Sequence, residues 1–297
     1  MTPSTSKYNI AAPFLLIFSL AMASCAKEPV VPVPTLTQTQ IPTPSETPIP
    51  LALSVNGEGI PVVEFEAELA RYQQAQADLG IAVNLEAATQ AVRNDMINTL
   101  LLEQGAGSQG FILDDAALQA RMDALTAQVG GADALAVWES AHGYSDPDFR
   151  SELRRQTAAA WMRDQVSASV SGTADQVHVK QILLYNSGDA QQALGFLQAG
   201  WSFADLAAQY EPVTKGELGW FPRGYLPSQV LEEAVFALQP GQYSSIIQDD
   251  SGYHILFVVE RDPARTLSPD ALLSLQKRAV QNWLTQRRNE STILIAP

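Results

Sequence analysis

Few residues of this chain could do nucleophilic or acid–base chemistry, and the most suggestive of them lie close together. Asp250, Ser251 and His254 follow one another within five positions, a grouping that invites comparison with a hydrolase triad. A nucleophilic serine of that kind normally stands in a sharp, glycine-flanked turn, and no such glycine pattern surrounds Ser251. We therefore interpret the three residues as part of some other kind of site.

Metal chemistry is equally poorly supported by the sequence. His142, His178 and His254 are the only histidines, and Cys25 is the only cysteine. Zinc sites need three or four clustered Cys, His or carboxylate ligands. We expect no metal and no cofactor, and a single cysteine also rules out disulfides within the chain as a source of stability.

The elements expected around His254 are strands and short helices. The run VHVKQILL at 177–184 is rich in β-branched residues and predicts a strand, followed by two helices that meet near 199–200. KGELGWFPRG at 215–224 is expected to be a loop. A helix then follows from 228, and DDSGYHILFVVERD at 249–262 predicts the strand that carries His254.

The sequence motifs of this region resemble those of the parvulin, or PpiC-type rotamase, family of peptidyl-prolyl cis–trans isomerases. The family phrase G-x-x-F-x-x-L-A is matched at 200–207, and its G-G-x-L-G-W-F loop is matched by KGELGWF at 215–221. Its F-E-E-A-x-F-x-L-x-x-G helix is matched at 231–241, and its G-Y-H-I strand at 252–255. The motifs occur in the family's order and are nearly ungapped.

Prolyl isomerisation requires no nucleophile. The barrier to rotation is roughly 20 kcal/mol, and an enzyme lowers it with an apolar slot for the proline ring, exclusion of water and donors that favour the twisted amide. The resemblance implies that His254 lies on the floor of such a pocket, with Ser251 nearby. The side chains that it implies for substrate binding are Leu218, Leu226, Leu231, Phe236 and Trp220.

Two positions depart from the family pattern. Gln181 stands where the first strand usually has a histidine, and the loop that commonly carries an Asp or Cys is shortened near Glu211, to which we assign no role. His178 cannot replace the missing histidine, because residues three apart on a strand point to opposite faces. Gln can donate and accept hydrogen bonds and could still orient His254. We expect a weakened isomerase with His254, Gln181 and Ser251 as its catalytic group; the alternative is a non-catalytic chaperone whose degenerate parvulin module binds unfolded chains.

The chain before this module is predicted to be helical. After a short strand at 51–57, helices are expected at 60–80, 85–104, 115–130, around 135–138 and at 145–170, followed by a linker, SGTADQ, at 171–176. A final helix after Ser268 has an apolar stripe that needs a partner surface, which we expect to be the helical domain. This plan resembles the SurA and PrsA class of extracytoplasmic foldases.

The fold class expected from these patterns is α+β. An all-helical, chaperone-like domain at 51–172 is completed by a C-terminal helix at 264–297. A parvulin-like domain at 175–263 is expected to have a small, mainly antiparallel sheet surrounded by helices.

The N-terminal segment has the pattern of an export signal. The apolar run at 10–22 has the length of a signal-peptide core and is shorter than the ~20 residues that span a bilayer. The residues that end in Cys25, Met-Ala-Ser-Cys, resemble a bacterial lipobox, so we predict a lipoprotein signal at 1–25 with lipid attached to Cys25; a plain secretory signal is the alternative. Residues 26–50 are rich in Pro and Thr and predict an extended, disordered tether.

The charge of the chain narrows its partners. A formal net charge of −14 argues against nucleic acid and favours basic partners mildly. We expect the partners to be unfolded or partly folded exported polypeptides with X–Pro bonds and, through the lipid anchor, a bacterial membrane. The expected location is extracytoplasmic, and dimerisation stays open.

Overall fold

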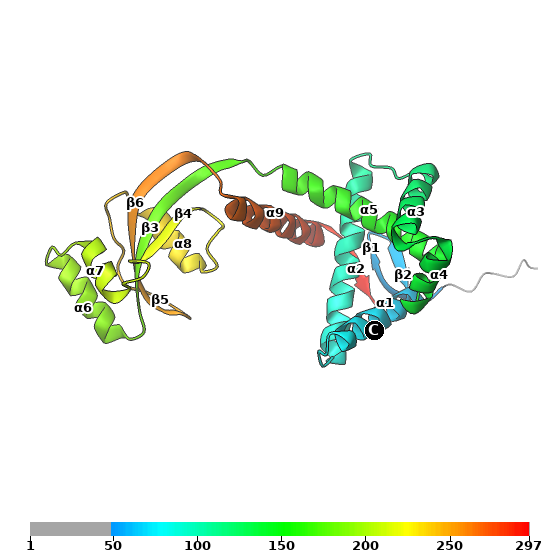
Figure 1. The fold of residues 1–297 in the computed structure, drawn as a ribbon, viewed down its shortest axis with the longest axis horizontal. Helices are drawn as coiled ribbons and strands as arrows, with labels where there is room; N and C mark the ends of the chain where they lie inside the picture. The colour runs from blue at the N-terminus through cyan, green and yellow to red at the C-terminus, as the bar shows by residue number, and fades with distance from the viewer. Residues whose placement is uncertain (1–48, 297) are drawn as a thin grey trace, which may run out of the picture. The chain divides into compact units, whose positions relative to one another are not determined.

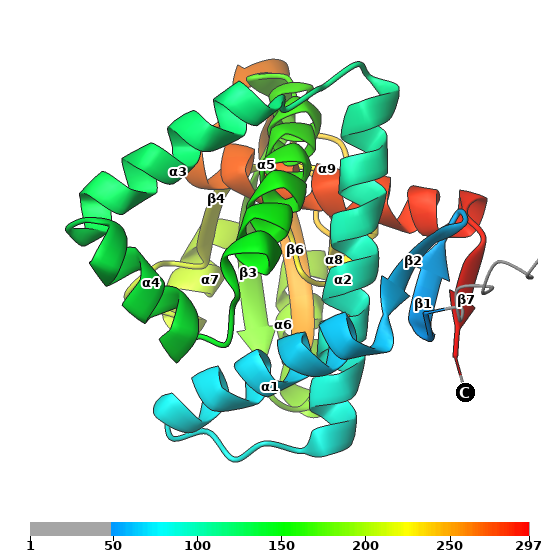
Figure 2. The ribbon, with the colours of Figure 1, turned by 90° about the vertical axis from the view of Figure 1, so that its right-hand side faces the viewer.

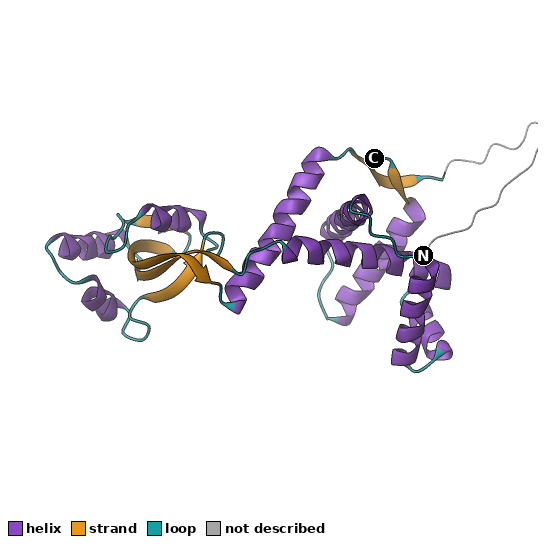
Figure 3. Cartoon of the chain, turned by 90° about the horizontal axis from the view of Figure 1, so that it is seen from above, coloured by secondary structure: helices purple, strands orange, loops and turns teal. Residues whose placement is uncertain are grey.

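A computed structural model describes residues 49–296 of the chain. The predicted signal peptide, Cys25 and residues 26–48 of the predicted tether lie outside the described residues. None of the described helices combines the length and apolar character needed to cross a membrane. The described part is a mixed α and β structure (Figures 1 and 3).

The N-terminal half is built mainly from helices, three of which begin after a residue whose side chain caps the first turn. Asn84, Asp114 and Ser145 each accept a hydrogen bond from a backbone N–H of the first turn. The helices are α1 (Val62–Asp78), α2 (Leu85–Ser108), α3 (Asp115–Val129), α4 (Ala132–Ala141) and α5 (Asp146–Ala168).

This helical part also contains a small sheet, which the all-helical expectation omits. β1 (Leu51–Val55), β2 (Glu58–Pro61) and β7 (Ile293–Ile295) form an antiparallel sheet in the order β2-β1-β7 (Figure 2). The backbone N–H of Asn56 donates to the carbonyl of Thr292 at 2.8 Å, and the backbone N–H of Thr292 donates to the side-chain oxygen of Asn56 at 3.0 Å. The N-terminal and C-terminal ends of the described residues are therefore neighbouring strands of one sheet.

Helix α9 (Pro269–Glu290) packs on the helical part. Trp283 and Leu284 contact the hydrophobic clusters formed by α2 and α5, as the apolar stripe of this helix leads one to expect. A Cβ added to Gly105 would lie 2.7 Å from the Trp283 ring, so the absence of a side chain there admits the indole. Gly105 also belongs to α2, which continues four residues beyond its expected end at 104.

The remaining elements form a four-stranded sheet with three helices. Its strands are β3 (Thr173–Leu184), β4 (Glu217–Pro222), β5 (Ile247–Asp249) and β6 (Gly252–Thr266), in the order β4-β3-β6-β5, and every pairing is antiparallel. The helices are α6 (Ser187–Gln198), α7 (Phe203–Tyr210) and α8 (Gln229–Ala237).

Two hydrophobic cores lie on the two faces of this sheet, because side chains alternate along each strand. On one face Ile182 and Ile255 pack with α6 and α7. On the other face Val179 and Leu256 pack with α8. Gln181 and His254 each lie two positions from one of these residues, Val179 and Leu256, so the predicted site lies on the α8 face.

Two segments differ from their expected structure. Residues 173–176 of the expected linker are the first part of β3, because they continue its pairing with β6. The expected loop at 215–224 contains strand β4, which pairs with β3 from Gln176 to Lys180. Residues that are depleted from strand interiors account for both differences: Asp175 in the first segment, and the glycines and the proline in the second.

Candidate active site

His254 is buried in the sheet, on the face covered by α8. Its exposed fraction is 3%. It lies two positions before Leu256 on β6, so the two side chains share a face, and Leu256 belongs to the core on that face. Leu183 lies opposite His254 in the register, and Leu256 lies opposite Gln181. Gln181 is therefore the diagonal neighbour of His254 on the same face.

The three residues predicted for catalysis are in contact. Nδ1 of His254 lies 3.2 Å from Oε1 of Gln181, and Nε2 of His254 lies 3.0 Å from the hydroxyl oxygen of Ser251. The amide of Gln181 therefore lies within hydrogen-bond distance of the imidazole ring. His178 lies on the opposite face, where its Nε2 contacts Glu217 and its ring stacks on Trp220.

Asp249 is a member of this group that the sequence reasoning missed. Its Oδ1 lies 3.0 Å from Nε2 of His254 and accepts hydrogen bonds from both the backbone N–H and the hydroxyl of Ser251, at 2.8 and 2.6 Å. The hydrolase comparison pointed to Asp250, whereas Asp249 is the carboxylate that contacts both residues. An Asp two positions before a Ser, at the start of a tight hairpin, is the signal of an Asx turn and could have identified it.

The surroundings of Asp249 keep its carboxylate charged. The hydroxyl of Ser251, which donates to it, holds the pKa of Asp249 well below its usual value; burial acts in the opposite direction. The backbone N–H of Ser251, the hydroxyl of Ser228 and the ring of His254 lower the pKa further. Because Ser251 donates its proton to a carboxylate, its oxygen is held as part of the network rather than freed as a nucleophile.

A shallow surface groove lies beside this group. Its walls come from the start of α8 and from the β5–β6 hairpin, and they are Pro227, Ser228, Val230, Leu231, Gln248, Asp249, Asp250 and Ser251. Leu231 is also part of the core beneath, with Phe236 buried and Leu226 packed against it. Apolar side chains thus line one side of the groove and polar side chains line the other.

Of the five residues predicted for substrate binding, only Leu231 lines this groove, since Leu226 and Phe236 pack in the core beneath it and the other two lie elsewhere. Trp220 lies on the other face of the sheet, where it stacks on His178 and the guanidinium of Arg265 lies 4.1 Å from its ring centroid. The cause is the alternation along β4, which turns Phe221 into the α8 core and Trp220 away from it. Leu218 is 37% exposed and belongs to neither core of the sheet.

Gly216, in the KGELGWF motif, fixes the backbone next to Gln181. The backbone N–H of Gln181 donates to the carbonyl of Gly216 at 2.7 Å. Gly216 has a φ of +71°, and a Cβ there would lie 2.1 Å from the carbonyl oxygen of Gln181. Only glycine allows the two segments to approach so closely.

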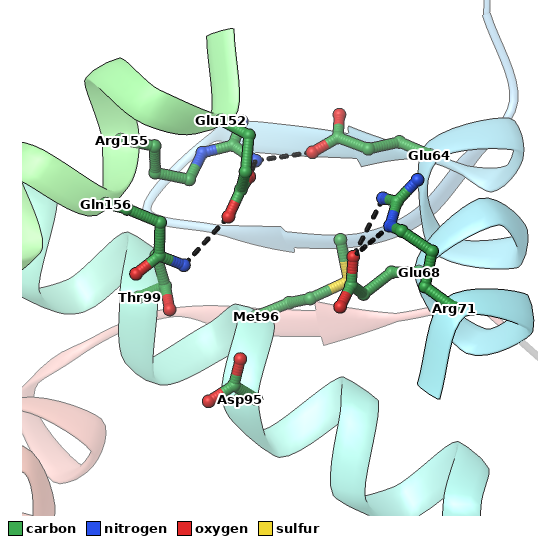
Figure 4. Close-up of a pocket in the computed structure, with 9 residues that line it drawn as sticks. All are labelled: Glu64, Glu68, Arg71, Asp95, Met96, Thr99, Glu152, Arg155 and Gln156. Carbon is green, nitrogen blue, oxygen red and sulfur yellow. Dashed lines mark hydrogen bonds and ion pairs between the residues drawn. The ribbon is translucent and has the colours of Figure 1, made fainter. Parts of the chain in front are cut away.

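A second, polar cleft lies between α1, α2 and α5 (Figure 4). Arg155 is directed across it to Glu64 and also contacts Glu103 at 3.4 Å, while Arg71 pairs with Glu68. Burial raises the pKa of the Glu103 carboxyl, and Glu58 raises it further, whereas Arg155 lowers it. These ion pairs join the three helices, and none of the predicted site residues lies there. Within residues 49–296 no three His, Cys, Asp or Glu side chains cluster as a metal site would require.

Parts of this chain are similar to known proteins. Residues 148–272 match the family model described as the PPIC-type PPIASE domain. Chaperone SurA of Methylobacillus flagellatus is 27% identical over 205 residues, which are 56% of this chain and 46% of that protein. Periplasmic chaperone PpiD of Haemophilus influenzae is 40% identical over 89 residues, 28% of this chain and 14% of that protein.

Further relatives carry the name foldase. Foldase protein PrsA of Halalkalibacterium halodurans is 32% identical over 91 residues, 29% of this chain and 27% of that protein. The chain thus spans less than half the length of each of these three curated relatives. Among solved structures, peptidylprolyl isomerase PrsA from Bacillus cereus aligns over 82% of this chain and 87% of its own, with 18% identity and a TM-score of 0.43. The chain contains a PpiC-type parvulin domain and is homologous to the SurA and PrsA foldases.

Proposed function

We propose that this chain is an extracytoplasmic foldase whose parvulin domain catalyses cis–trans isomerisation of X–Pro bonds in unfolded or partly folded exported polypeptides. The observation that carries the proposal is the contact of buried His254 with Gln181, Ser251 and Asp249 beside a half-apolar groove. The relatives named as chaperones and foldases, one of them periplasmic, support the same setting.

The chemistry follows from what prolyl rotation needs. Val230 and Leu231 offer an apolar wall against which a proline ring can bind, with Pro227 beside them. The groove also carries the hydroxyls of Ser228 and Ser251, both of which donate to Asp249. To stabilise a twisted amide, one of them exchanges this acceptor for the amide of the bound segment. Catalysis in such a groove needs no covalent intermediate, since the bond that changes is only rotated.

Gln181 favours a second candidate function, a parvulin module that binds unfolded chains without catalysis. An amide can orient His254 but cannot take up or release a proton as a second imidazole can. The proposal therefore includes an isomerase of reduced activity, with His254, Gln181, Ser251 and Asp249 as its polar group.

A pair of assays on the full chain separates the two functions. A protease-coupled assay on a prolyl peptide measures isomerisation, and light scattering of a denatured client measures suppression of aggregation. The enzyme predicts a rate above the uncatalysed one that falls on His254→Ala, with Glu233→Gln on the solvent side of α8 as a control. No catalysed rate together with intact suppression of aggregation would establish the binding function instead.

The membrane attachment and the domain division are also proposed. The lipobox pattern before Cys25 supports a lipid-anchored chain on a bacterial membrane, with residues 26–50 as a tether. The helical part, 51–172 with 264–297, is proposed as the chaperone-like domain and 175–263 as the isomerase domain. Fractionation of cells that express Cys25→Ser tests the anchor: the variant should leave the membrane fraction, and its retention there would refute lipid attachment.

A further inference from the structure

The groove beside His254 carries negative charge on one wall. Asp249 and Asp250 are the charged side chains among its lining residues, and neither Lys nor Arg lines it. The carboxylate of Asp249 is turned towards Ser251 and His254, which hold it in the network. Asp250 is exposed in the two-residue turn between β5 and β6, and it forms no salt bridge within residues 49–296.

The four basic side chains of β3, β6 and the loop between β4 and α8 are engaged elsewhere, so they do not neutralise this wall. They contact aromatic rings or other carboxylates: Arg223 lies 4.2 Å from the Phe236 ring centroid, Arg265 4.1 Å from that of Trp220, Arg261 pairs with Asp175, and Lys180 lies 3.7 Å from Glu217. A ligand in the groove therefore faces Asp249 and Asp250 with no Lys or Arg side chain lining the same groove.

From this arrangement we infer that the groove selects prolyl segments with lysine or arginine next to the proline and disfavours segments with an acidic or phosphorylated residue there. The inference rests on the proposed function, since it takes the groove as the place where X–Pro segments bind. When the ring contacts Val230 and Leu231, a neighbouring side chain can extend along the opposite wall to Asp250. Asp250 then forms an ion pair with the lysine or arginine side chain of the bound polypeptide.

The expected size of this preference is modest. An ion pair at an exposed site changes an affinity by about 1.5- to 5-fold, and salt reduces the effect. The preference between a lysine and a glutamate at the same position combines one attraction with one repulsion, so a ratio of roughly 2- to 20-fold is expected at low salt.

The experiment uses the full chain and three labelled peptides that differ only in the residue before proline, which is Lys, Gln or Glu. Fluorescence anisotropy gives the three affinities without turnover, and a protease-coupled assay gives kcat/KM on the same peptides. The affinities should fall in the order Lys, Gln, Glu, and the spread should shrink in about 0.5 M salt, where the Debye length is a few ångströms. Asp250→Asn should reduce the Lys-to-Glu ratio by about 1.5- to 5-fold, Asp250→Lys should invert the order, and Glu233→Gln should leave the ratio unchanged.

The outcomes separate the two proposals. Equal affinities for the Lys and Glu peptides, or a ratio that survives Asp250→Asn, overturns the selection of basic segments even if all three peptides are isomerised. Ordered affinities without isomerisation of any peptide uphold the selection and count against the isomerase. Failure of all three peptides to bind overturns the inference and the assignment of the groove together.

Discussion

Replacement of Gly216 by alanine tests how the candidate site is built. The carbonyl oxygen of Gly216 accepts a hydrogen bond from the backbone N–H of Gln181, at 2.7 Å. An alanine Cβ would lie 2.1 Å from the carbonyl oxygen of Gln181 and 3.0 Å from Cβ of Ala207. Real Cβ atoms do not tolerate the first distance, so the backbone of the loop must move away from β3.

The loss of folding stability expected for Gly216→Ala has two separable parts. A φ of +71° is unfavourable for alanine by about 1–2 kcal/mol. The displaced loop adds the strain of overpacking, about 1–3 kcal/mol, and weakens the hydrogen bond to Gln181. Gly216→Ala should therefore lower the free energy of unfolding of the parvulin domain by about 2–5 kcal/mol.

Gly219 provides a matched control in the same segment. Its φ is +77°, and an added Cβ would meet nothing within 4 Å, so Gly219→Ala should cost only the about 1–2 kcal/mol of the backbone conformation. Hydrogen exchange of the Gln181 amide gives a local measure, and urea denaturation gives the global one. Equal losses for the two variants, or undiminished protection of the Gln181 amide in Gly216→Ala, would refute this account of the loop.

Three further predictions concern single side chains. Gln181→His should raise kcat/KM for a prolyl peptide, because it places a second imidazole beside Nδ1 of His254, whereas Gln181→Leu should lower it; a higher rate for the leucine variant would contradict the assigned role. Asp249→Asn should destabilise the chain at pH 7: the lowered pKa means that the native carboxylate stabilises the fold above the unfolded value of 3.8, and this contribution is lost as the pH falls through the native pKa. Thermal melts should therefore show a difference between variant and parent that shrinks in acid, and a constant difference would exclude an electrostatic origin. Glu103→Gln should stabilise the chain at pH 7, because a raised carboxyl pKa means that the charged form is disfavoured in the fold. That gain in stability should disappear as the pH falls from the native pKa of Glu103 towards the unfolded value of 4.5. A Glu103→Gln variant that is less stable than the parent at pH 7 would show that the pairing of Glu103 with Arg155 outweighs the burial of the carboxylate.

Much of the site's geometry could be predicted because it depends on parity along a strand. The count of positions from His178 to Gln181 sufficed to put them on opposite faces, and the contact of Gln181 with His254 confirms that Gln181 lies on the inner one. The same rule, applied to β4, would have turned Trp220 away from the groove. The glycines of KGELGWFPRG indicate a loop, however, and a loop has no such alternation.

Asp249 could not be found by matching family motifs, because its role depends on a hairpin. β5 is three residues long and has no hydrophobic pattern of its own, so only the Asx-turn signal of Asp249 and Ser251 indicates the hairpin that pairs Asp249 with Gly252. Only that pairing makes Asp250 and Ser251 the turn and brings the Asp249 carboxylate back to His254. In the helical part, β7 was missed for a similar reason, since three residues are too few for a periodic signal.

The pairing of β1 with β7 has a consequence for the order in which the chain can fold. Asn56 and Thr292, which hydrogen-bond to each other, are 236 positions apart in the sequence. A chain that is synthesised or threaded through a membrane from its N-terminus presents β1 long before β7 exists, so the edge of β1 stays unpaired until the parvulin domain between them has emerged. The parvulin domain can thus fold first, and the β1–β7 pairing that completes the helical part can form only afterwards.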